Sequence, residues 1–130
     1  MARVALVLSL VNVGGCATLD ELVSTFFAPE DQDTFLAVAF CESSADPNDT
    51  YSIAVNPKSG ATGWFQHLPK WWSERSKLAG FGGRSIYDPT AQVAVASWLF
   101  YNQNKNERWG GLSHWYPSRR CLNKQGVEMK

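Results

Sequence analysis

Residues 35–43 read Phe35-Leu-Ala-Val-Ala-Phe-Cys41-Glu42-Ser43, the most informative stretch of the chain. Its first seven residues are apolar, and no charge interrupts them until Glu42. Upstream, Pro29-Glu30-Asp31 is typical of a helix start, because proline fits the first turn and acidic side chains complement the positive end of the helix dipole. We therefore expect a helix from residue 29 to about Ser43 that is apolar on nearly all sides and is the central buried helix.

The residues on either side predict further helices. Thr18-Leu-Asp-Glu21 has the form of a capping box, and apolar residues follow it at helical spacing until Pro29. Another helix is predicted from Pro69 to Ala79, and a fourth begins at Asp88-Pro89 and continues to about Asn104. Residues 44–67 contain Asp-Pro, Asn-Pro and glycine turn signals, so we expect irregular or short-stranded structure there. The sequence thus predicts one mainly α-helical domain.

Composition excludes several classes of protein. The chain has 130 residues, 45% of them hydrophobic, which suits one globular domain rather than a disordered or coiled-coil protein. Residues 1–57 hold eight acids and one base, and residues 58–130 hold four acids and eleven bases, so net charges of −7 and +7 cancel. The two halves either neutralise each other or form oppositely charged walls of a cleft that faces a charged polymer. A strongly basic nucleic-acid binder is not indicated.

The amino terminus has the pattern of an export signal. One positive charge, Arg3, precedes the apolar run 4–13, and Val13-Gly-Gly-Cys16 resembles a lipoprotein cleavage box in which Cys16 carries the lipid anchor. We assign residues 1–17 to this segment, 18–122 to the domain and 123–130 to a polar, frayed tail. The alternative is that the apolar run is a first buried element of the domain. Export permits a disulfide, and Cys41–Cys121 is the expected pair, unless both are buried thiols.

Glu42 is the residue whose position most needs a chemical explanation. It lies at the negative end of the helix dipole and is flanked by apolar surface, and both effects disfavour its ionised form. Its pKa should therefore be raised, as a general acid that cleaves a glycosidic bond requires. The alternative is an ordinary solvated glutamate at a helix end.

A longer pattern supports the chemical interpretation. Cys41-Glu42-Ser43 is followed by Asn56-Pro-Lys-Ser-Gly-Ala-Thr-Gly-Trp-Phe-Gln66. This resembles the lysozyme-like soluble lytic transglycosylases and goose-type lysozymes, in which a Glu-Ser pair ends a buried helix and an Asn-Pro turn precedes Ser-Gly-Ala-x-Gly-Leu-x-Gln. The resemblance covers about residues 18–121 and is closest to actinobacterial and phage versions, although Trp64 replaces the usual leucine. It implies an α+β lysozyme-like fold, in which helices around the central helix and a short hairpin or loop region form a glycan cleft.

The resemblance also implies an activity. Glu42 would protonate the β-1,4 bond between N-acetylmuramic acid and N-acetylglucosamine in peptidoglycan and then remove the proton of the muramic C6 hydroxyl, which gives a 1,6-anhydro end. No metal or organic cofactor is implied, and the protein is expected to be a monomer that is exported to the cell envelope or outside, or a phage virion or lysis protein. The expected substrate contacts are Ser59, Gly63, Trp64, Gln66, Tyr87, Trp98 and Tyr101.

Three alternatives remain open at this point. A hydrolytic muramidase needs a second carboxylate, for which Asp46 and Asp49 are the nearest candidates. A non-catalytic peptidoglycan-binding module could use the tryptophans, all six of which lie in the second half. A cysteine peptidase would pair Cys41 with His67 or His114, although a thiol in an apolar run should be inert.

Overall fold

The structure is a computed structural model that describes residues 16–102 and 111–129. This part of the chain is mainly helical, as predicted, and its β-pairing is limited to isolated bridges that join Val55 to Thr62 and Thr62 to His67. The helices are α2 (Leu19–Phe26), α3 (Pro29–Ser43), α4 (Pro69–Leu78), α5 (Pro89–Asn102), the 3₁₀ helix η1 (Gly111–Ser118) and α6 (Arg119–Lys124).

The local signals set the helix ends. The Thr18 hydroxyl accepts from the backbone N–H of Glu21 at 3.2 Å, and the Glu21 carboxylate accepts from the Thr18 N–H at 2.9 Å, which confirms the capping box. Helices α3 and α4 begin at Pro29 and Pro69, as predicted. Helix α3 ends where Ser44 adopts a left-handed conformation, with φ of 58°.

Helix α5, and not α3, is the most deeply buried of the described helices. All residues from Ala91 to Ser97 are buried, and α5 contacts α2, α4 and η1. Helix α3 buries one face, at Phe35, Val38 and Ala39, while Phe40 remains 46% exposed. The prediction that residues 29–43 form the central helix is therefore wrong, because the small side chains of α5 let neighbours approach it from several sides.

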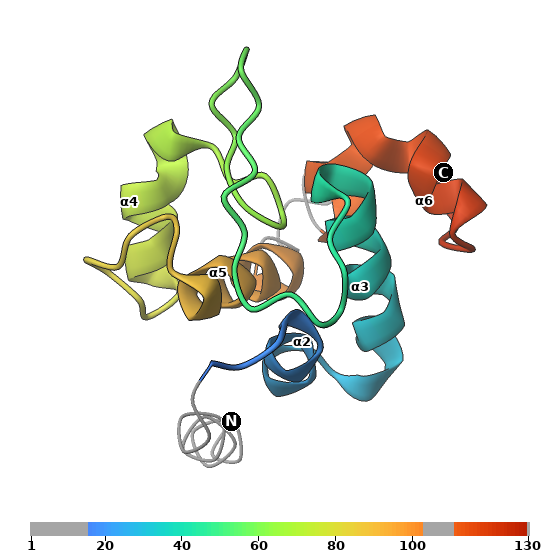
Figure 1. The fold of residues 1–130 in the computed structure, drawn as a ribbon, viewed down its shortest axis with the longest axis horizontal. Coiled ribbons are helices and arrows are strands. Elements are labelled where there is room, and N and C mark those ends of the chain that lie inside the picture. The colour runs from blue at the N-terminus through green and yellow to red at the C-terminus, as the bar shows by residue number, and fades with distance from the viewer. Residues whose placement is uncertain (1–15, 103–110, 130) are drawn as a thin grey trace.

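The segment between α3 and α4 projects from the helices. In Figure 1 it descends from the end of α3 toward α2 and then rises, in green, between α4 and α3 and extends beyond both. Helix α3 contacts α2, η1 and α6, so the carboxyl-terminal elements pack beside the end of α3 that carries Glu42. This arrangement positions the site described below.

The carboxyl-terminal residues correct the predicted frayed tail. Helix α6 includes Asn123 and Lys124, and the Val127 N–H donates to the Leu122 carbonyl at 2.9 Å. Val127 and Met129 pack against the core, so apolar contacts hold residues that a polar composition predicted to be loose.

The predicted export segment falls mostly on residues 1–15, which lie outside the described residues. Cys16, the candidate lipid anchor, is exposed and has a free thiol. None of the helices found in residues 16–102 and 111–129 is long and apolar enough to cross a membrane.

The charge asymmetry is not resolved by ion pairs between the two halves. Among the described residues the ion pair is Arg84–Asp88, at 2.9 Å, and both partners belong to the second half. Neutralisation through side-chain contacts between the halves is therefore absent from this part of the chain.

Candidate active site

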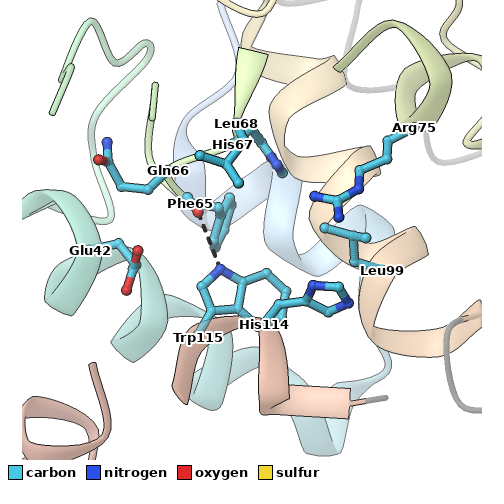
Figure 2. A pocket seen from close by; sticks show the side chains of 9 residues that line it. All are labelled: Glu42, Phe65, Gln66, His67, Leu68, Arg75, Leu99, His114 and Trp115. Carbon is cyan, nitrogen blue, oxygen red and sulfur yellow. Dashed lines mark hydrogen bonds between the residues drawn. The ribbon is translucent and has the colours of Figure 1, made fainter. Parts of the chain in front are cut away.

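A pocket of about 110 Å³ lies beside the carboxyl end of α3 (Figure 2). The ring of Trp115 and the backbone of Phe65 meet inside it, where the indole Nε1–H donates to the Phe65 carbonyl at 3.2 Å. Side chains reach the pocket from α3, the loop before α4, α4, α5 and η1. The residues that line it are Glu42, Phe65, Gln66, His67, Leu68, Arg75, Leu99, His114 and Trp115.

Glu42 is partly buried in the pocket wall. Burial raises the pKa of its carboxyl above the ordinary value of 4.5, and a hydrogen bond from the Ser118 hydroxyl acts in the opposite direction. The raised pKa agrees with the sequence-based expectation. Ser118 was not anticipated, because 76 residues separate it from Glu42 and no local pattern connects them.

Replacing Ser118 with alanine is expected to raise the pKa of Glu42 further. The hydroxyl stabilises the ionised carboxylate, so its loss leaves the burial effect unopposed. Carbon-13 NMR titration of the glutamate carboxyls measures this directly. Ser24→Ala is the matched control, because among the described residues the Ser24 hydroxyl bonds only to the Glu21 carbonyl within its own helix. An unchanged or lower pKa in Ser118→Ala contradicts the assignment.

The disulfide Cys41–Cys121 is present, as predicted, with the two Cα atoms 5.7 Å apart. One cysteine immediately precedes Glu42, and the other follows Ser118 by three residues. The covalent link therefore holds the segment that carries Ser118 against the end of α3. The bond also removes the thiol that a peptidase based on Cys41 would need.

The loop that carries Gln66 is fixed by a buried glutamine on α5. Gln92 is fully buried, its Oε1 accepts from the Trp64 N–H at 3.0 Å, and its Nε2 donates to the Ile86 carbonyl at 2.9 Å. Its backbone carbonyl lies 2.8 Å from His67 Nε2, and since a carbonyl only accepts, that nitrogen is protonated and donates. Gln92 was not anticipated from the sequence, because a glutamine among alanines and valines gives no sign of its partners.

Gly63 is required by this network. Its φ is +86°, and a Cβ at this position would lie 2.4 Å from Gln92 Oε1. Gly63 therefore serves the packing of the loop, and no observation brings a substrate to it.

Gly63→Ala is expected to lower the free energy of unfolding by about 3 kcal/mol. Roughly 1 kcal/mol comes from the left-handed backbone and about 2 kcal/mol from displaced buried hydrogen bonds of Gln92. Urea unfolding measures the loss. Gly80→Ala is the matched control, since Gly80 has φ of +89° but a Cβ added there would meet no atom within 4 Å. Equal losses of unfolding free energy in the two variants would contradict the proposed packing of Gln92 against Gly63.

Gln66 lies on the same side of the pocket as Glu42 (Figure 2). Its φ is 55°, and its Nε2 donates to the Gly63 carbonyl at 3.0 Å and to the Ala54 carbonyl at 3.4 Å. These bonds hold the amide in one orientation. Its Oε1 accepts no hydrogen bond from the described residues, which leaves an oriented acceptor on the Glu42 side of the pocket.

Trp64 does not face a ligand. Its side chain is 0% exposed and belongs to the core, which corrects its prediction as a substrate contact. Its backbone contributes instead: the Trp64 carbonyl accepts from the Ser43 hydroxyl at 3.0 Å, which ties the loop to the residue after Glu42.

The remaining predicted contacts lie outside the pocket lining. Ser59 is exposed in the projecting segment, Tyr87 is exposed just before α5, and Trp98 packs partly against the core. The Tyr101 hydroxyl donates to an Asp31 oxygen at 2.5 Å and accepts from the Ala28 N–H at 2.9 Å. Tyr101 therefore joins α5 to the α2–α3 junction.

The two candidate second carboxylates are engaged elsewhere. Asp46 accepts from the Asn48 N–H at 2.8 Å, and Asp49 accepts from the Asp46 N–H at 2.9 Å. Their turn is bonded to the start of α2, through Leu19 N–H and the Asp49 carbonyl at 2.7 Å. Neither lines the pocket, where Glu42 is the one carboxylate among the lining residues.

Neither a cluster of metal-binding side chains nor a similarity to a known protein identifies the site. In residues 16–102 and 111–129, no three His, Cys, Asp or Glu side chains lie together as a metal site requires. The chain matches no protein-family model, and no curated protein or solved structure is significantly similar to it.

Proposed function

We propose that this protein cleaves the glycan strands of peptidoglycan as a lytic transglycosylase, with Glu42 as both acid and base. The observation that carries the proposal is a partly buried glutamate of raised pKa that is the one carboxylate among the residues lining its pocket. The sequence pattern around Glu42 and Gln66, which resembles that of lysozyme-like transglycosylases, supports the choice of substrate.

The proposed reaction needs one carboxyl group acting twice. The protonated carboxyl of Glu42 gives its proton to the oxygen that joins C1 of N-acetylmuramic acid to C4 of N-acetylglucosamine. The bond between C1 and this oxygen breaks, and the oxygen leaves as the C4 hydroxyl of N-acetylglucosamine. The resulting carboxylate takes the proton of the muramic C6 hydroxyl while O6 bonds to C1. Atoms balance without water, and the acid is regenerated.

The neighbours of Glu42 suit both steps. Burial favours the protonated form that starts the reaction, and the Ser118 hydroxyl stabilises and orients the carboxylate that follows. The Gln66 amide oxygen can accept from an N–H or hydroxyl of the sugar. We place the enzyme outside the cytoplasm, since the Cys41–Cys121 disulfide is favoured in oxidising compartments.

The products of a peptidoglycan digest test this proposal. Mass spectrometry of muropeptides released by the wild-type protein is expected to show 1,6-anhydromuramic ends. Ordinary reducing ends would instead identify a muramidase, and Asp46 and Asp49 would then be tested as the base. Retained binding to peptidoglycan without soluble products would identify a non-catalytic binding module.

A further inference from the structure

The end of the pocket opposite Glu42 is lined by basic side chains. Figure 2 shows Glu42 and Gln66 on one side and Arg75, His67 and His114 on the other, with the Phe65 and Trp115 rings between them. The basic residues come from α4, the loop before it and η1. The proposed cleavage chemistry gives them no role.

Arg75 is a partly buried cation that forms no ion pair with a carboxylate of the described residues. The neighbouring Glu74 attracts it electrostatically, but Glu74 is exposed and lies beyond ion-pair distance. Its guanidinium contacts the Trp71 ring, with its central carbon 5.7 Å from the centroid. Because desolvated charges in proteins are normally paired, a half-buried arginine that lines a pocket indicates an anionic ligand.

His114 adds an unsatisfied donor or acceptor to the same end. Its Nε2 is buried and has no hydrogen-bond partner among the described residues. Burial lowers the pKa of His114, and it lowers that of His67 to about 4, so both rings are neutral at neutral pH. His67 is already committed through Nε2 to the Gln92 carbonyl. Arg75 supplies the positive charge, and His114 can supply one N–H.

We propose that Arg75 and His114 form an anion subsite that binds a carboxylate of the substrate across the pocket from Glu42. The identity of that carboxylate rests on the proposed function. In peptidoglycan it is either the lactyl carboxylate of a muramic acid that has lost its peptide, or a carboxylate of the peptide stem.

The size of the pocket suits an acid group at this end. A volume of about 110 Å³ is enough for a carboxylate group and the atoms next to it. Leu99, which also lines the pocket, offers apolar surface beside the basic groups. The basic groups therefore face the acid end of the ligand, and the guanidinium fork of Arg75 suits two carboxylate oxygens.

Binding of D-lactate to the whole protein tests the subsite without any assumption about catalysis. In the wild type, D-lactate is expected to shift the His114 ring signals in NMR spectra and to raise the pKa of His114, whereas the neutral isostere D-lactamide does neither. Arg75→Gln should weaken D-lactate binding about 10-fold or more. Lys77→Gln, which removes the same charge from an exposed position on α4, should leave binding unchanged.

Equal shifts with D-lactate and D-lactamide, or equal weakening by both substitutions, would overturn the subsite. If thermal melting shows that Arg75→Gln is unfolded, Arg75→Lys replaces it. This variant keeps the charge but loses the fork, and it is expected to bind D-lactate more weakly than the wild type and Lys77→Gln do.

Digestion of two substrates identifies the source of the carboxylate. If the lactyl group binds, Arg75→Gln should lower kcat/KM about 10-fold on strands stripped of peptide and little on strands with peptide stems. If Arg75→Gln instead lowers kcat/KM mainly on strands with peptide stems, the bound group is a carboxylate of the stem. If the wild type is active and Arg75→Gln is equally active on both substrates, the anion subsite is overturned but the proposed function is not. Wild-type inactivity on both overturns the proposed function, while D-lactate binding still tests the subsite.

Discussion

Glu42→Gln is expected to lower the rate of peptidoglycan cleavage by about 10³-fold or more. Glutamine keeps the size of the side chain and can still accept from Ser118, but it can neither donate a proton to the leaving oxygen nor remove one from the C6 hydroxyl. General acid–base groups contribute about 10²–10⁴-fold, and here one group serves both steps. Release of anhydro-ended muropeptides, followed by mass spectrometry over time, gives the ratio of rates.

Glu30→Gln is the matched control, because Glu30 lies exposed at the opposite end of the same helix. Removal of the Glu30 carboxylate should leave the rate of peptidoglycan cleavage unchanged. A Glu42→Gln protein that cleaves at the wild-type rate would exclude Glu42 as the catalytic acid. An equal fall in Asp46→Asn or Asp49→Asn would point to a second carboxylate and to hydrolysis.

The same substitution has a stability consequence whose sign follows from the raised pKa. The folded protein holds the Glu42 proton more tightly than the unfolded chain does, so rising pH above about 4.5 disfavours folding of the wild type. Glutamine does not ionise. The Tm of Glu42→Gln minus that of the wild type should therefore be larger at pH 7 than at pH 4, and thermal melts at the two values measure it.

Loss of the Cys41–Cys121 disulfide is expected to cost about 4.5 kcal/mol of unfolding free energy in the chain-entropy model. The bond spans 80 residues and ties α3 to α6. A Cys41→Ser, Cys121→Ser double variant should also lose activity while still folded, since η1 carries His114 and Trp115 to the pocket and Ser118 to Glu42. Urea unfolding and cleavage assays on the same preparation measure both effects.

Cys16→Ser is the control for this experiment, because Cys16 is exposed and unpaired. It should match the wild type in stability and cleavage rate, and a reductant should destabilise it as much as it does the wild type. A double cysteine variant that retains full activity would show that packing alone holds Ser118 at Glu42.

Several features of the site were predictable because their signals are local or chemically selective. Glu42 follows an apolar run at a helix end, and this position predicted the partial burial and the raised pKa that the structure shows. Cys41 and Cys121 could be paired by elimination once Cys16 was assigned to the export segment. The prediction for Trp64 was wrong, because the sequence of a glycine-rich loop does not show whether an aromatic ring in it faces a ligand or the core.

The sequence by itself determined where helices α2, α3, α4 and α5 begin, and it marked Glu42 as the candidate acid. Capping boxes, prolines and helical spacing operate over about four residues, so the chain carries them without reference to the fold. Tertiary structure alone decided that α5 is the central helix, that Gln92 fills the space beside Gly63, and that Ser118 reaches Glu42. It also brought Arg75 and His114 to the pocket. These outcomes depend on which distant surfaces meet, and contacts between residues tens of positions apart leave no periodic pattern in one sequence.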